Sequence, residues 1–201
     1  MISRRVSKAI QVGDVTVGGS APITVQSMTK TDTRDVKATV RQIKELEEVG
    51  CDIIRPAVPD MEAAKALREI KKQVKIPVIA DIHFHYQLAL ESIAAGVDGL
   101  RLNPGNIRDR EKVELVVRAA KEKQIPIRIG VNFGSLPPVG QIGQFGGLHR
   151  HTDGVNKLAK AGEAVEGQIS VVDHMVATAL WEISILEDLD FDLIKISLKA
   201  F

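Results

Sequence analysis

Basic residues recur in this sequence within short runs of β-forming residues or directly after them. The positions are Arg55, Arg101, Arg128 and Lys199. If the runs are parallel strands, their carboxyl ends meet at one end of the fold and bring these cations together. Converging cations bind phosphate oxygens, and arginine can do so through two hydrogen bonds at once. The pattern therefore predicts a site for phosphate or diphosphate.

The alternation of side chains along each strand predicts which other residues share this site. In the run 125–131, Ile127 and Ile129 would meet the helices, while Arg128 points to the opposite face. The same alternation places these polar residues on the inner face: Arg55, Asp81, His83, Arg101, Asn103, Asn132, Lys195, Ser197 and Lys199. Buried cations in excess of carboxylates require a compensating anion. For Asp81 alone a second interpretation stays open, a structural ion pair with one arginine.

Runs of β-forming residues alternate with amphipathic segments from Ile23 onward. We expect strands at 23–28, 52–55, 77–81, 99–102, 125–131 and 192–198. We expect helices at 35–49, 60–74, 87–95, 110–123 and 171–186, where apolar residues recur at helical spacing. Before the first strand, 9–17 alternates around Gly13-Asp14, as is typical of a hairpin with a two-residue turn. Strands that alternate with helices indicate a parallel sheet with helical crossovers.

The charged inner faces favour a barrel over an open doubly wound sheet. Helices cover both faces of an open parallel sheet, so both faces should be apolar. No glycine-rich dinucleotide fingerprint follows the first strand, where the residues are 26–31. We therefore expect an α/β fold of the TIM-type (β/α)8 barrel class, incomplete here, with about six βα units. The N-terminal β-hairpin falls within 1–22 and closes the bottom of a partial barrel at 23–201.

Composition limits the remaining possibilities. The 201 residues are 44% hydrophobic and carry a net charge of +1, which argues against a large nucleic-acid surface. No apolar segment reaches the length of a membrane span or a signal peptide, so a reducing cytoplasmic setting is expected. The single cysteine, Cys51, excludes an internal disulfide and cannot hold an iron–sulfur cluster by itself. We expect no metal ligands on this chain.

Six ordered segments together resemble one enzyme family, the 4-hydroxy-3-methylbut-2-enyl diphosphate synthases of non-mevalonate isoprenoid biosynthesis. The segments are VQSMTKTDT (25–33), CDIIR (51–55), ADIHF (80–84), LRLNPGNI (100–107), RIGVNFGSL (128–136) and FDLIKISLKA (191–200). The resemblance implies a substrate-binding barrel joined to a C-terminal domain, absent from this chain, whose three cysteines and one glutamate bind a 4Fe-4S cluster. It also implies the two-electron reduction of 2-C-methyl-D-erythritol 2,4-cyclodiphosphate, with ferredoxin or flavodoxin as electron donor and a homodimeric assembly.

The resemblance also implies roles for individual residues. Those that would bind the diphosphate or the rest of the substrate are Gln26, Ser27, Arg55, Arg101, Asn103, Arg128 and Lys199. His83, Asn132 and Asp81 would serve catalysis by orienting substrate and intermediate. A barrel of this family without its cluster domain is expected to be inactive alone.

Two other interpretations remain at this point. A pterin-binding barrel similar to dihydropteroate synthase also collects Asn, Asp, Lys and Arg at its strand ends. A non-catalytic subunit of a split enzyme would share the same motifs. The glycine-rich stretch 134–154 is expected to be a functional or mobile loop, and its role is left open.

Overall fold

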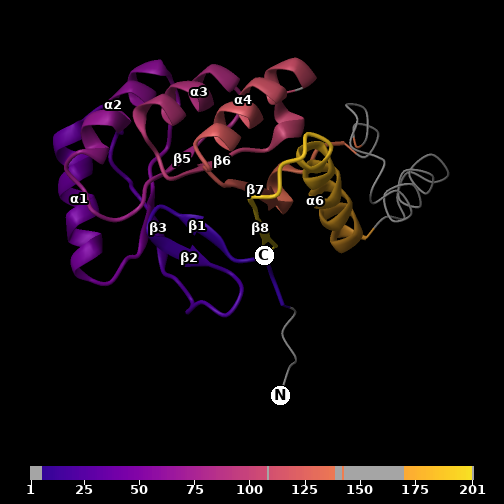
Figure 1. The fold of residues 1–201 in the computed structure, drawn as a ribbon, viewed down its shortest axis with the longest axis horizontal. Helices are drawn as coiled ribbons and strands as arrows, with labels where there is room; N and C mark the ends of the chain where they lie inside the picture. The colour runs from indigo at the N-terminus through magenta and orange to yellow at the C-terminus, as the bar shows by residue number, and fades with distance from the viewer. Residues whose placement is uncertain (1–5, 108, 139–141, 143–169, 201) are drawn as a thin grey trace.

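The computed structural model describes residues 6–107, 109–138, 142 and 170–200, in which strands alternate with helices (Figure 1). The strands are β1 (Ile10–Val12), β2 (Val15–Val17), β3 (Gln26–Met28), β4 (Ile53–Arg55), β5 (Ile79–Asp81), β6 (Gly99–Arg101), β7 (Ile127–Asn132) and β8 (Ile194–Lys199). The helices are α1 (Val36–Glu48), α2 (Met61–Lys71), α3 (Tyr86–Ala95), α4 (Arg110–Glu122) and α6 (Val171–Glu187), with the 3-10 turns η1 (Pro104–Asn106) and η2 (Phe133–Ser135). The predicted helices are confirmed to within a few residues, and most strands are shorter than the apolar runs suggested.

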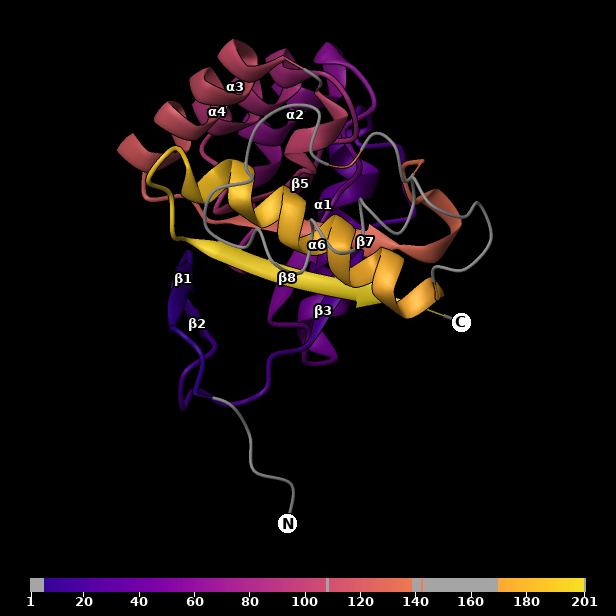
Figure 2. The same cartoon turned by 90° about the vertical axis from the view of Figure 1, so that its right-hand side faces the viewer.

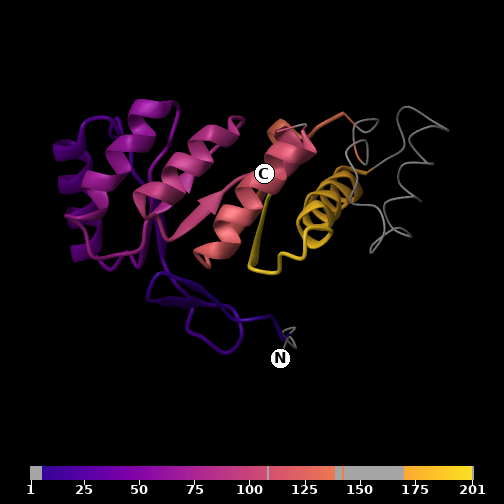
Figure 3. The same ribbon diagram turned by 45° about the horizontal axis from the view of Figure 1, so that its top comes forward.

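The strands β3 to β8 form an open parallel arc in sequence order. β3 pairs with β4, and β5, β6, β7 and β8 pair in succession, all in parallel. Single bridges from Ile54 to Val78 and from Ala57 to Asp81 connect β4 to the start and end of β5. Helices follow the strands on the outside of the arc (Figures 1 and 3). In the part of the chain that the structure describes, the expected partial barrel is therefore present as five βα units and a sixth strand, β8.

Four of the five described α-helices start at a side chain that satisfies a free backbone N–H. Asp35, Asp60 and Asp109 accept hydrogen bonds from the N–H groups of Ala38, Ala63 and Lys112. Ser170 does the same for Asp173 at the start of α6. Such caps stabilise a helix by about 1 kcal/mol each and fix where it begins.

A repeated Gly-x-Asp sequence ends two helices and starts the strands that follow them. Gly50 and Gly96 adopt positive φ angles of 91° and 90°, which end α1 and α3 in a left-handed conformation. Two residues later, Asp52 and Asp98 accept hydrogen bonds of 2.7 Å from the backbone N–H groups of Val25 and Val78. Each aspartate thus ties the start of its own strand to the start of the preceding one.

The inner face of the arc has an apolar lower layer and a polar upper layer. Val12 of the hairpin packs against Ile53 and Ile79, and these three residues are at most 2% exposed. The expected antiparallel hairpin is confirmed, with Gly13-Asp14 as its turn. It lies on the opposite side of the molecule from α2, α3 and α4 (Figures 1 and 2). Arg55 and Asp81 lie on the same face, two residues after Ile53 in β4 and Ile79 in β5. The polar layer begins with these two residues.

The larger core lies between the strands and the helices. Ile54, Leu100 and Ile129 on the outer faces of their strands are at most 1% exposed, and Leu67 and Ile70 of α2 are fully buried. The expected loop at 134–154 lies outside the described residues except for 134–138 and 142.

Candidate anion-binding site

A pocket of about 300 Å³ opens at the carboxyl ends of the strands. The residues that line it come from β3, β4, β5, β6, β7 and β8 or directly follow them: Met28, Arg55, Asp81, His83, Arg101, Arg128, Gly130, Val131, Asn132, Ser197 and Lys199. Most of the polar residues that the alternation predicted thus converge on one pocket, whereas Asn103 and Lys195 do not line it. Two larger surface hollows, one along α1 and one beside α4, lie away from these strand ends.

Asp81 lies among three potential cations. Its carboxylate oxygens are 3.4 Å from Arg55 Nε, 3.5 Å from Arg101 Nη1 and 3.7 Å from His83 Nε2. Asp81 is 4% exposed, and the side chains of Arg55 and Arg101 are 16% and 15% exposed. One carboxylate cannot balance two largely buried guanidinium groups, and Arg128 adds a third.

Arg128 lies in the same layer with few protein partners. Its Nη2 donates a 2.7 Å hydrogen bond to Ser197 Oγ on β8. Its buried Nε has no hydrogen-bond partner among the described residues, and neither has the buried Nε of Arg55. Burial, followed by the charges of Arg55 and Arg101, lowers the pKa of Arg128 to about 10. An incoming anion would supply the missing hydrogen-bond acceptors and reduce the repulsion between these guanidinium groups.

Two lysines of β8 extend the positive surface. Lys195 pairs in register with Arg128, and Lys199 pairs with Asn132. Burial lowers the pKa of Lys195, and the charges of Arg128 and Arg55 lower it further. Lys199 is exposed and lines the pocket directly.

Asn103 binds the neighbouring strand instead of lining the pocket. Its Nδ2 donates to the carbonyl of Gly130 and its Oδ1 accepts from the N–H of Gly130, both at 2.9 Å. Arg101 Nη2 donates to the same carbonyl at 3.2 Å. A Cβ at position 130 would lie 2.8 Å from Arg101 Nε, so the glycine leaves the space in which the guanidinium lies.

His83 and Asn132 lie at the more open side of the pocket. The His83 side chain is 57% exposed, and its ring is 6.0 Å from that of Phe84. Asn132 Oδ1 accepts a 3.3 Å hydrogen bond from the N–H of Gly134, which starts the turn after β7. Both residues are placed to contact a ligand that enters between the arginines and the solvent.

Strand β3 contributes Met28 to the lining of the pocket, and not Gln26 or Ser27, which the resemblance implied. Gln26 pairs with Ile53 in the lower layer, and Ser27 pairs with Ile54, whose side chain belongs to the outer core. Neither lines the pocket, whereas Met28 pairs with Arg55 and does. Met28 Sδ accepts a 2.8 Å hydrogen bond from Arg55 Nη2. The strand alternation thus places Ser27 on the wrong face for this pocket.

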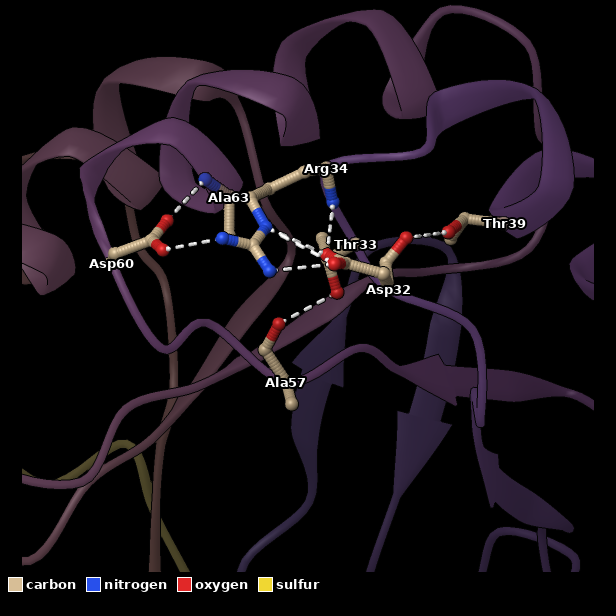
Figure 4. A network of polar contacts seen from close by, with 7 residues as sticks. All are labelled: Asp32, Thr33, Arg34, Thr39, Ala57, Asp60 and Ala63. Carbon is tan, nitrogen blue, oxygen red and sulfur yellow. Dashed lines mark hydrogen bonds and ion pairs between the residues drawn. The ribbon is translucent and has the colours of Figure 1, made fainter.

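Charged residues fix the loop that follows β3 beside the pocket (Figure 4). Arg34 donates to Asp32 at 2.6 Å and lies 3.3 Å from Asp60, the N-cap of α2. Thr33 Oγ1 donates to the carbonyl of Ala57 at 2.6 Å. The hydrogen bonds from Arg34 lower the pKa of Asp32 to about 2. These contacts join the β3–α1 loop to the β4–α2 loop.

The described residues do not fit a four-iron cluster. No group of three or more His, Cys, Asp or Glu among them could hold a metal ion. Cys51, the one cysteine of the sequence, is buried, and its Sγ donates to the carbonyl of Ile53 at 3.2 Å.

Sequence reasoning missed one buried acid near this site. Glu182 of α6 is 2% exposed and accepts a 2.7 Å hydrogen bond from the N–H of Gly105, in the turn after Asn103. A signal was present in the sequence, because Glu182 is the one charged residue between Met175 and Leu186, a largely apolar part of the helix. Its partner is 77 residues away in sequence, so the contact itself was not predictable locally.

The fold and the pocket define a class: a TIM-type α/β barrel segment with a cation-rich pocket at the carboxyl ends of its strands. Residues 7–201 match the family model described as the GcpE TIM-barrel domain. The chain belongs to this family, as the resemblance of its motifs predicted.

Curated relatives from bacteria are named 4-hydroxy-3-methylbut-2-en-1-yl diphosphate synthase (flavodoxin). One from Dehalococcoides mccartyi is 56% identical over 201 residues, which cover 100% of this chain and 51% of that protein. One from Thermodesulfovibrio yellowstonii is 54% identical over 200 residues, again 100% of this chain and 51% of that protein. The chain thus spans about half the length of these relatives.

Solved structures of other enzymes share the fold. The 7,8-dihydropteroate synthase of Vibrio fischeri aligns with a TM-score of 0.58 at 10% identity, covering 97% of this chain and 67% of that one. A phospho-2-dehydro-3-deoxyheptonate aldolase of Thermotoga maritima aligns with a TM-score of 0.54 at 11% identity, covering 96% and 47%. At such identities the likeness concerns the barrel alone. Among the described residues, no helix is long and apolar enough to cross a membrane.

Proposed function

We propose that this chain is the substrate-binding barrel of a 4-hydroxy-3-methylbut-2-enyl diphosphate synthase, and that its pocket binds the diphosphate of 2-C-methyl-D-erythritol 2,4-cyclodiphosphate. The observation that carries the proposal is the excess of buried cations around Asp81, with unsatisfied Nε groups on Arg55 and Arg128. A diphosphate offers several acceptor oxygens and the negative charge that these groups lack. The names of the relatives, at 50 to 56% identity, give a diphosphate as the product, and the resemblance of the motifs implies the cyclodiphosphate substrate.

The position of each residue in the pocket indicates its role in substrate binding. Arg55, Arg101, Arg128 and Lys199 would bind the phosphate oxygens. His83 and Asn132, at the open side, would orient the carbon skeleton of the substrate and of the intermediate. Asp81 would keep Arg55 and Arg101 in place and hold the ring of His83, whose Nε2 lies 3.7 Å from its carboxylate.

Other residues would act on the site indirectly. Asn103 would support the pocket through Gly130, and Gln26 would support β3 from the lower layer. Flavodoxin as electron donor, a 4Fe-4S cluster held outside these residues, homodimeric assembly and a cytoplasmic location belong to the same proposal. Their support is the names of the relatives and the resemblance of the motifs.

Binding by the purified chain tests the proposal directly. Calorimetric titration with the cyclodiphosphate should show saturable binding, and Arg128→Ala should weaken it by about 10- to 150-fold, the scale of one charge-assisted hydrogen bond. Arg68→Ala, an exposed arginine on α2, is the matched control and should leave the affinity unchanged. Preference for a pterin diphosphate over the cyclodiphosphate, or equal affinity of the Arg128→Ala variant, would overturn the proposal.

A further inference from the structure

Glu182 is a buried acid that the anion pocket does not use directly. It is 2% exposed and lies on α6 among the core residues Trp181, Ile185 and Leu186. Burial raises the pKa of Glu182 to about 7, although the hydrogen bond from Gly105 and the charge of Arg101 lower it. An ionised carboxylate in such surroundings opposes folding, so stability does not account for its presence.

The carboxylate holds a turn next to the pocket. Glu182 Oε2 accepts a 2.7 Å hydrogen bond from the backbone N–H of Gly105, the middle residue of η1. Trp181 packs on the same residue, since a Cβ at position 105 would lie 2.5 Å from its Cη2 and 2.8 Å from Glu182 Oε1. Two consecutive side chains of α6 therefore fix this turn, and they do so from outside the pocket.

Turn η1 connects to the pocket at both of its ends. Asn103 directly precedes the turn and exchanges two 2.9 Å hydrogen bonds with the backbone of Gly130. Asn106, the last residue of the turn, donates from Nδ2 to the carbonyl of His83 at 3.4 Å. A displacement of the turn would thus reach Gly130, which contacts Arg101, and the backbone that carries His83.

We propose that Glu182 is a positioning residue for the anion pocket: by holding the N–H of Gly105, it fixes η1 and, through Asn103 and Asn106, the places of Gly130 and His83. This inference rests on the proposed function, because the pocket must bind an anion for the positioning to matter. It assigns Glu182 no contact with the ligand.

The charge and the hydrogen bond of Glu182 have opposite effects on anion binding. A carboxylate near Arg101 reduces the attraction of the pocket for an anion, whereas the hydrogen bond to Gly105 orders it. Arg101 is the charged side chain of the strands that acts on Glu182, because η1 offers no titratable group and the outer faces of β7 and β8 carry Ile and Leu or Val. Glu182→Gln keeps the acceptor and removes the charge, while Glu182→Leu removes both. Comparison of the two variants isolates the hydrogen bond.

Calorimetric titration of the whole chain with inorganic pyrophosphate at pH 8 tests the proposal. Glu182→Leu should bind about tenfold more weakly than Glu182→Gln, which should stay within about threefold of the unaltered chain. Equal affinity of the two variants would overturn the positioning role. If the unaltered chain itself does not bind pyrophosphate, the proposed function fails, and the second measurement alone decides whether Glu182 positions the turn.

The second measurement is a pH titration followed by NMR, which needs neither a ligand nor the Glu182→Leu variant. Amide NMR spectra between pH 5.5 and 8.5 should show Gly105, Asn103 and Gly130 shifting together, with a midpoint near the pKa of about 7. The shared shift should disappear in Glu182→Gln. A shift of Gly105 alone would show that the turn does not pass the change to the pocket, and would overturn the proposal.

Discussion

The absence of a side chain at residue 130 is as important to the pocket as the charges around it. Gly130 lies on the inner face of β7 in register with Ser197, and its missing Cβ gives Arg101 its place. Its carbonyl also accepts a hydrogen bond from Asn103 Nδ2, and its N–H donates one to Asn103 Oδ1. A glycine in the interior of a strand weakens the strand, and here it marks a close approach of a functional side chain.

Gly130→Ala should therefore weaken anion binding while the protein stays folded. A methyl group would lie 2.8 Å from Arg101 Nε, and the flexible end of the arginine would move away rather than the backbone. We expect pyrophosphate affinity to fall about tenfold, the scale of one weakened charge-assisted contact, with a change in unfolding free energy below about 1 kcal/mol. Calorimetry and urea denaturation measure the two quantities. A large loss of stability with intact affinity would contradict this account of Gly130.

The site was predictable from the sequence where strand alternation was clear. Arg101 and Arg128 each stand between two large aliphatic residues, so their shared inner face follows from period two alone. The first strand offered no such contrast, because Gln26 and Ser27 are both polar and Met28 is apolar on the inner face. Glu182 escaped prediction because its role depends on Gly105, a contact made only after α6 packs beside η1.

At the scale of elements, local chemistry explains most of the boundaries that the sequence predicted. Asp35, Asp60 and Asp109 cap their helices as expected of N-cap residues, and Gly96 ends α3. The strands were harder to delimit, since a run such as 23–28 is apolar at Ile23 and Val25, which the structure leaves 81% and 56% exposed. Hydrophobicity marks a strand candidate, but pairing with a neighbour defines its length.

Helix α6 should make stability depend on pH through Glu182. Its pKa rises on folding from 4.5 to about 7, so the folded state binds an extra proton between these values and its stability falls as pH rises through them. The shift corresponds to roughly 3 kcal/mol, fully lost above pH 7. Glu182→Gln removes the titration, so its stability relative to the unaltered chain should increase between pH 5 and pH 8. Urea denaturation at both pH values measures this, and the prediction fails if the difference between the two proteins is the same at each.

At the scale of the whole molecule, the described strands form an arc with two edges, β3 and β8. The hairpin covers the lower end of the arc (Figure 2). The outer face of β8 leaves Ile196 and Leu198 49% and 52% exposed. An edge strand with exposed apolar residues presents unpaired backbone groups to any similar edge. Strand β8, which pairs with β7 beside Arg128, thus also forms an exposed apolar edge at which a second chain could associate.

The 201-residue chain should therefore associate as its concentration rises. Sedimentation velocity should show the average mass increasing from that of one chain toward that of a dimer or larger species. Replacing both Ile196 and Leu198 by lysine should weaken association by at least about tenfold, since each buried aliphatic side chain contributes roughly 1.5–3 kcal/mol and charges protect edges. Leu115→Lys, at a 44% exposed position on α4, is the matched control and should change little. A chain that stays monomeric at all concentrations would show that the β8 edge is protected in solution, and equal effects of the control and the double variant would place the contact elsewhere.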